Sequence, residues 1–180
     1  MHTFGAFEED ALHCVQRANA RGQLCSLEHF ARRHGAACYS TLREALYPVA
    51  EAGAGDVLEF FMKTLCLDAL WYCSDTGATV LHHAARVGRT ELLSGVFQRH
   101  NVAQHVEVAD DFGRIPPIWC GKRRRNIEFL QLLLELGSQG PTTTDQDGRS
   151  VESFSRLHYA LASKLRRFIT QCIASALDLE

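Results

Sequence analysis

The chain has 180 residues, 46% of them hydrophobic, and a formal net charge of −2, which suits one domain or a short array of repeats and provides no global attraction for nucleic acid. No uninterrupted apolar run approaches the roughly 20 residues that a bilayer requires, and the N-terminal residues lack the basic-then-apolar order of a secretory signal. Seven cysteines, an odd number that falls partly in helix-like runs, predict reduced thiols and an intracellular protein, cytoplasmic or nuclear, without membrane association.

The first helical segment is expected over roughly 8–35, where apolar residues recur at helical spacing. At its end, Cys25, His29, His34 and Cys38 form the pattern C-x3-H-x4-H-x3-C. Cys25 and His29 would share one helix face, with His34 and Cys38 in the loop that follows, so zinc ligation is one interpretation. A helix with a polar connector is the favoured interpretation, because this spacing is not one of the common zinc patterns.

The next two segments, 40–70 and 75–105, repeat one pattern without a gap. Matching residues stand at a constant distance along the chain, and they include apolar residues, a small residue, a glycine and an acidic residue. The aligned pairs are Leu46 with Leu81, Ala50 with Ala85, Gly53 with Gly88, and Asp56 with Glu91. Such an internal echo predicts a repeat architecture.

The segments 8–35 and 111–140 carry the pattern in weaker form, and the latter contains an amphipathic run that includes Ile127, Leu130 and Leu133 at helical spacing. Residues 145–180 are predicted to form a degenerate final repeat with a capping helix. Aspartate- and glycine-containing turn signals precede three of the segments, at Asp75–Thr79, Asp110–Pro116 and Asp145–Ser150.

The stretch GATVLHHAARVG, residues 77–88, resembles the ankyrin-repeat signature G-x-T-P-L-H-x-A-A-x-x-G, with valine in place of proline. The resemblance implies that Thr79 and His82 hydrogen-bond with each other and with the neighbouring turn, and that Gly88 permits the reversal between two helices. A catalytic or metal-binding pair of His82 and His83 is disfavoured, because adjacent side chains on a helix point about 100° apart.

The expected fold is therefore an all-α ankyrin-repeat solenoid of about four helix-turn-helix units with a C-terminal helical cap, forming a single domain; a fifth unit stays open. Each unit is predicted as a turn, a short helix, a glycine-centred break and a longer helix, and neighbouring units bury their apolar faces by stacking. The predicted units are approximately 8–35, 40–70, 75–105 and 111–140, followed by the degenerate repeat and capping helix at 145–180.

In ankyrin folds, as the resemblance implies, partners dock on the concave side, which the turn tips and the exposed ends of the first helices form. The candidate partner-binding residues at those positions are Arg86, Asp111, Phe112, Arg114, Arg123, Arg124, Gln146 and Arg149. The arginines would share one face, and Phe112 would be an exposed anchor. We expect another protein as the partner, in particular an acidic segment held against the arginines.

Two other functions are compatible with parts of the sequence. Lys122–Arg125, KRRR, is the densest run of charge and would serve a nuclear regulatory protein as an import signal. The cysteine and histidine residues described above would serve a zinc protein or an enzyme. Against an enzyme, no phosphate-binding glycine loop and no G-x-S-x-G motif occur, so we expect no catalytic residues, no metal and no cofactor.

Overall fold

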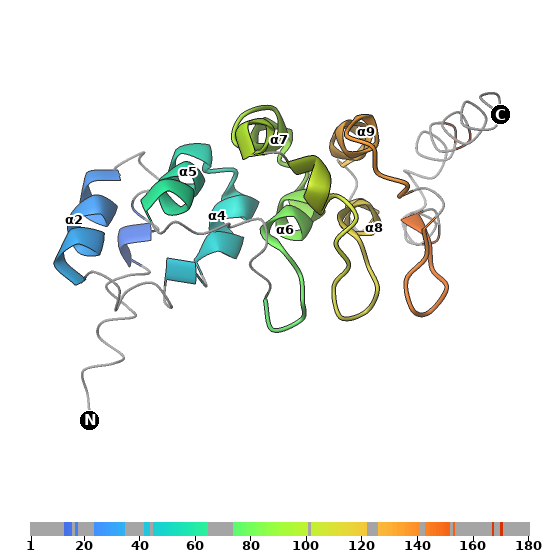
Figure 1. The fold of residues 1–180 in the computed structure, drawn as a ribbon, viewed down its shortest axis with the longest axis horizontal. Helices are drawn as coiled ribbons and strands as arrows, with labels where there is room; N and C mark the ends of the chain where they lie inside the picture. The colour runs from blue at the N-terminus through green and yellow to red at the C-terminus, as the bar shows by residue number, and fades with distance from the viewer. Residues whose placement is uncertain are drawn as a thin grey trace.

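The computed structural model describes residues 13–15, 17, 24–34, 42–43, 45–64, 74–100, 102–121, 126–140, 143–151, 153, 167 and 170. Over these residues the protein is all-α, with no strand and one isolated bridge, between Thr144 and Ser150 (Figure 1). None of the described helices has the length and apolar character needed to cross a membrane.

The described helices are short and follow one another in pairs. They are α2 Leu24–His34, α4 Leu46–Ala52, α5 Gly55–Thr64, α6 Val80–Val87, α7 Thr90–Ser94, α8 Pro116–Cys120 and α9 Ile127–Glu135, with the 3-10 helices η2 Phe97–His100 and η3 Val102–His105. In α4 and α5, in α6 and α7, and in α8 and α9, the chain reverses between the two helices of a pair (Figure 1).

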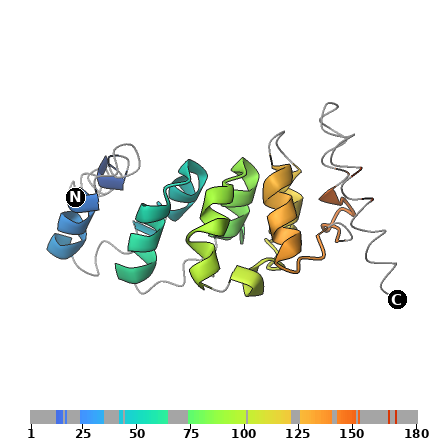
Figure 2. The ribbon, with the colours of Figure 1, turned by 90° about the horizontal axis from the view of Figure 1, so that it is seen from above.

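The pairs are stacked side by side along the long axis of the molecule. We call α4, α6 and α8 the first helices of their pairs, and α5, α7 and α9 the second helices. Among the first helices, α6 packs against both α4 and α8, and the second helix α7 packs on α9 of the next pair. Figure 2 shows α5, α7 and α9 in a row when the molecule is seen from above. Helices α4, α6, α7, α8 and α9 thus pack against a neighbouring pair, as expected for units that cannot form a core alone.

The aligned leucines of the repeated pattern occupy equivalent places in this core. Leu46 lies at the start of α4 and Leu81 near the start of α6, and both side chains are fully buried. Burial of a leucine side chain contributes about 1.5–3 kcal/mol. Ala84 and Ala85 are also fully buried, and their small volume lets α6 fit closely between α4 and α8.

Two glycines end the first helices of consecutive pairs, as the sequence predicts. Gly53 follows α4 with φ 75°, and Gly88 follows α6 with φ 78°. The Gly53 N–H donates to the Ala50 carbonyl at 3.2 Å and the Gly88 N–H to the Ala84 carbonyl at 2.8 Å. Since side chains rarely tolerate this left-handed conformation, glycine permits the reversal of the chain at both places.

The predicted order of a short helix followed by a longer one is wrong in one pair. There α6 has eight residues and α7 has five. The second helix ends because Gly95 leaves the helical region, with φ −100° and ψ −87°, and glycine makes this departure inexpensive. The chain continues as η2 and η3. The predicted capping helix, the residues from 154 onward in particular, lies largely outside the described residues.

Candidate interaction surface on the stacked loops

Among the described residues, three loops precede first helices and share one backbone design: residues 74–79, 110–115 and 145–150. The N–H of the first residue donates to the carbonyl of the fifth, as in Ser74 to Ala78 at 2.8 Å, Asp110 to Arg114 at 3.0 Å and Asp145 to Arg149 at 2.9 Å. The fourth residue of each is a glycine, with φ of 71° or 72°. We call these three segments the loop row; Figure 1 shows them below the helices.

Direct hydrogen bonds join neighbouring loops of the row. The Asp111 N–H donates to the Thr76 carbonyl at 3.0 Å, and the Gln146 N–H donates to the Phe112 carbonyl at 3.1 Å. The Gln146 side-chain amide adds a bond to the Asp111 carbonyl at 3.0 Å. The tips are therefore held in a fixed order before any ligand arrives.

A buried carboxylate organises the middle loop. One oxygen of Asp110 accepts the backbone N–H groups of Phe112 at 3.0 Å and Arg114 at 2.9 Å. The other accepts Nε of Arg114 at 2.7 Å and the indole N–H of Trp119, on α8, at 3.0 Å. Because this carboxylate is 0% exposed, the positive charge of Arg114 compensates a charge that would otherwise be costly to bury.

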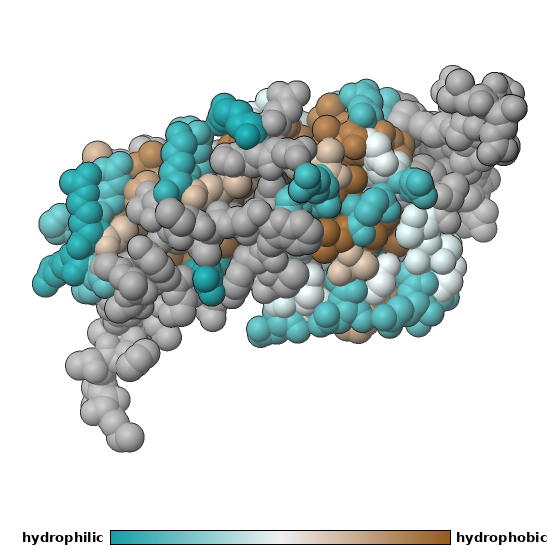
Figure 3. Space-filling model, in the orientation of Figure 1, coloured by the Kyte–Doolittle hydropathy of each residue, from teal (hydrophilic) through white to brown (hydrophobic). Residues whose placement is uncertain are grey.

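The Arg114 guanidinium also packs between two aromatic rings. It lies 4.5 Å from the centre of the Phe112 ring and 5.3 Å from that of Trp119. Phe112 is nevertheless 49% exposed, the one large hydrophobic side chain that is exposed within the described ranges. In Figure 3 the lower edge of the molecule, where Figure 1 places the loop row, is mostly teal or white, with brown atoms directly above it.

The last loop repeats this arrangement around an equally buried aspartate, Asp145, but its arginine is more exposed. Asp145 accepts the backbone N–H groups of Asp147 at 3.0 Å and Arg149 at 2.8 Å, and its second oxygen accepts Nε of Arg149 at 3.1 Å. Burial alone would raise the pKa of Asp145, but the hydrogen bonds from Arg149 and Asp147 hold it below its ordinary value. Arg149 also contacts Asp147, so this arginine is paired within its own loop.

The predicted structural roles of Thr79 and His82 are confirmed. Nε2 of His82 lies 2.8 Å from the Arg114 carbonyl and must donate its hydrogen there. Nδ1 is then the acceptor, for the Thr79 N–H at 3.0 Å and the Thr79 hydroxyl at 2.8 Å. Burial lowers the pKa of His82 to about 4, so the ring is neutral near pH 7 and links the start of α6 to the next loop.

A second polar cluster lies between the ends of α4 and α6. Nδ1 of His83 donates to a carboxylate oxygen of Glu51 at 2.8 Å, and the same oxygen pairs with Arg86. Burial would raise the pKa of Glu51, but the bonds from Arg86 and His83 hold it below its ordinary value. The His83 ring lies 4.6 Å from Tyr47 and 5.4 Å from Trp119, centre to centre.

The structure brings together most of the predicted binding residues that it describes. Five of them lie on the middle and last loops, namely Asp111, Phe112, Arg114, Gln146 and Arg149. Arg86 stands apart, near the end of α6, and Arg123 and Arg124 fall outside the described residues together with the rest of the KRRR run.

The basic stripe expected from the arginines is not a set of free charges. Arg86 is paired with Glu51, Arg114 with Asp110, and Arg149 with two aspartates. Sequence reasoning missed the acidic partners. For Asp110 the sequence held a signal, since the aspartate at the start of an Asp-Gly turn often binds the loop backbone with its side chain. No local sequence pattern predicts the contact between Glu51 and Arg86, because it joins two helix pairs.

The predicted zinc ligands have only part of the expected placement. His34 is the last residue of α2 instead of a loop residue, because the helix continues beyond the predicted break, and Cys38 lies outside the described residues. A pocket of about 440 Å³ is lined by His13, Cys14, Cys25, His29, Phe30, Arg33 and His34. Within the part of the chain that is described, no three histidine, cysteine or acidic side chains are grouped closely enough to hold a metal ion.

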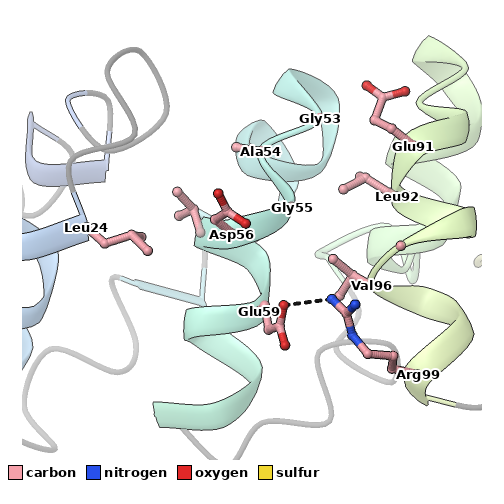
Figure 4. A pocket seen from close by; sticks show the side chains of 12 residues that line it. Leu24, Gly53, Ala54, Gly55, Asp56, Glu59, Glu91, Leu92, Val96 and Arg99 are labelled. Atoms are coloured by element: carbon pink, nitrogen blue, oxygen red, sulfur yellow. Dashed lines mark hydrogen bonds and ion pairs between the residues drawn. The ribbon is translucent and has the colours of Figure 1, made fainter.

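Another pocket, of about 370 Å³, lies between α5 and α7 on the side of the second helices (Figure 4). Gly53, Gly55 and Gly95 have no side chains to fill the pocket, and Leu92 and Val96 supply apolar lining. On its rim, Glu59 pairs with Arg99 at 2.7 Å. Because this ion pair joins α5 to η2, the 3-10 helix that follows α7, the pocket is explained by the packing of neighbouring pairs.

The comparisons with known proteins assign no family to this chain. No family model matches it, and no curated protein matches it either.

Proposed function

We propose that the protein is a non-enzymatic protein-interaction module, an ankyrin-like solenoid that binds a partner on the face formed by the loop row and the first helices. One observation carries the proposal. A row of loops, fixed to one another by hydrogen bonds, presents the exposed ring of Phe112. Phenylalanine is among the aromatic residues that are enriched at the core of protein interfaces, and a preformed surface loses little freedom on binding.

The histidines and a cysteine of the described core support a structural rather than a chemical role. His82 is neutral and fully engaged in hydrogen bonds. Burial raises the pKa of the Cys120 thiol, which disfavours the reactive thiolate. These groups support the stacking of the units, as the resemblance to ankyrin repeats implies.

Affinity purification from cells, followed by mass spectrometry, tests the proposal. Wild type and Phe112→Ala would be compared, with Phe60→Ala as a control on the side of the second helices. We expect specific partners to be recovered with wild type and with the control, and to be reduced at least tenfold with Phe112→Ala. Equal recovery with all three proteins would contradict binding through the loop row.

A nuclear regulatory role remains a second proposal, based on Lys122–Arg125. Four consecutive basic residues are a recognised pattern for import. Imaging a fluorescent fusion with and without these four side chains changed to alanine would test it. An unchanged distribution would remove the basis for this role. The same run includes Arg123 and Arg124, which are the arginines that an acidic partner segment would contact.

A further inference from the structure

We propose that the loop row binds a basic segment of another protein, with an arginine or lysine side chain placed against the exposed ring of Phe112. This inference rests on the proposed function and specifies the chemistry of the partner. The arginines in the sequence suggest an acidic partner. The structure favours a basic partner instead, because the arginines that it describes among the predicted binding residues are paired with carboxylates.

The charges of the loop row carry the first step. Residues 74–79, 110–115 and 145–150 contain five aspartates and two arginines. Both arginines, Arg114 and Arg149, are bound to aspartates of their own loops. Asp75 and Asp111 are exposed and form no ion pair with any described residue. The row therefore presents uncompensated negative charge, which attracts a basic ligand and repels an acidic one.

The exposed aromatic ring is an independent observation that points to the same ligand. Phe112 follows Asp111 directly, and the Arg114 guanidinium packs 4.5 Å from the centre of its ring. The face of an aromatic ring attracts cations, with a contribution of about 0.5–2 kcal/mol, and arginine is the most frequent partner. Phe112 already contacts one guanidinium, and 49% of its surface remains exposed for a second cationic side chain.

The fixed spacing of the loops favours an extended segment as the occupant. Asp111 is bonded through its N–H to the loop before it, and its carbonyl accepts the side chain of Gln146 from the loop after it. The unpaired carboxylates of Asp75 and Asp111 consequently lie on successive loops rather than in one pocket. A segment with several basic residues can contact them in turn as it crosses the row.

Fluorescence anisotropy with defined peptides tests the inference. The probes are a fluorescein-labelled peptide of alternating arginine and serine, and a matched peptide with glutamate in place of arginine. We expect wild type to bind the arginine peptide, and binding to weaken at least tenfold in the double variant Asp75→Asn, Asp111→Asn and also in Phe112→Ala. Raising the salt concentration should weaken binding as well.

A charge-matched control separates a site from general attraction. The double variant Asp56→Asn, Glu128→Gln removes two exposed carboxylates from α5 and α9, away from the loops. It should retain wild-type affinity, with circular dichroism confirming that all variants are folded. An equal loss in this control, tighter binding of the glutamate peptide, or no binding of the arginine peptide would each overturn the inference. If cellular partners still depend on Phe112 in those cases, the proposed function survives without it.

Discussion

The loop at 110–115 and the loop at 145–150 have the same local design, an aspartate followed by a glycine and an arginine at identical spacing. In both, the aspartate accepts two backbone N–H groups of its own loop and the side chain of the arginine. They differ in what surrounds that design. The arginine side chain of the middle loop is 17% exposed, and that of the last loop is 48% exposed.

The difference shows that the local sequence determines the backbone conformation of a loop. The residues packed around the loop determine how much its interactions contribute to the free energy of unfolding. Asp110 binds the indole N–H of Trp119, and Arg114 packs between two rings. Asp145 has no such contact with a helix among the described residues. Both carboxylates are buried, but a mostly buried arginine that loses its partner is more costly than a half-exposed one that water can solvate, so equal changes in the two loops should have unequal effects.

The largest effect is expected when the two aspartates are replaced. Asp110→Ala leaves Arg114 as a mostly buried charge and Trp119 without its acceptor, and should lower the free energy of unfolding by about 3–5 kcal/mol. Asp145→Ala should cost about 1–2 kcal/mol, because water can solvate Arg149. Urea unfolding of both variants gives the two values. Equal losses would contradict the proposed dependence on neighbours.

The next effect concerns two glycines with the same backbone conformation, φ 71° at Gly77 and φ 72° at Gly148. The Cβ of an alanine at Gly77 would lie 2.9 Å from the Asp111 backbone nitrogen, whereas nothing lies within 4 Å of one at Gly148. Gly148→Ala should therefore cost only the strain of a left-handed residue, about 1 kcal/mol. Gly77→Ala should cost about 3 kcal/mol, because the neighbouring loop must also move.

Thermal or urea unfolding compares the two glycine variants directly. A Gly77→Ala protein as stable as Gly148→Ala would show that the hydrogen bonds between loops contribute little to the fold.

A smaller effect is expected from acidification. The pKa of His82 is about 4 in the folded protein and 6.5 for the unperturbed side chain. The unfolded chain therefore binds the proton more readily, and the stability present above pH 6.5 is lost as pH falls toward 4. From about pH 7.5 to about pH 5 the loss should be about 2 kcal/mol. His83, whose pKa burial also lowers, adds to it in the same direction.

Urea unfolding at several pH values measures this loss, with His82→Gln as the control. Glutamine retains a donor and an acceptor but does not titrate, so the variant should lose clearly less stability over the same range. Identical pH dependence in the two proteins would assign the effect to other groups.

The smallest effect is expected at the ion pair between α5 and η2, the 3-10 helix that follows α7. Arg99 and Glu59 are 2.7 Å apart, and the arginine side chain is 57% exposed. Exposed pairs contribute about 0–1 kcal/mol, and salt screens them. Arg99→Gln should therefore change the free energy of unfolding by less than about 1 kcal/mol at physiological salt. A larger loss would mean that this contact between α5 and η2 contributes more to stability than an ordinary exposed ion pair.

The predictable part of the fold depended on recurring spacing. Leu46 and Leu81 could be aligned from the sequence, and both are buried at the beginning of first helices. Gly53 and Gly88 could be identified as breaks, and both have positive φ. The short length of α7 could not be derived, because Gly95 ends it inside a run that otherwise has helical spacing.

The candidate site was predictable in position but not in charge. The turn signals placed Asp111, Phe112 and Gln146 on loop tips, and the structure joins them by hydrogen bonds. Counting arginines suggested a basic stripe. That count could not include contacts such as the one between Arg86 and Glu51, because those residues stand far apart in the chain and meet only when helix pairs stack.

By itself, the sequence determined the local features of this protein: amphipathic helices, glycine breaks between them, and loops shaped by an aspartate and a glycine. These depend on backbone conformation and on contacts within a few residues. Only the tertiary structure decided which charges are compensated and which ring stays exposed. Pairing and burial depend on residues about one repeat apart, such as His82 and Arg114, which approach each other only after the units have stacked.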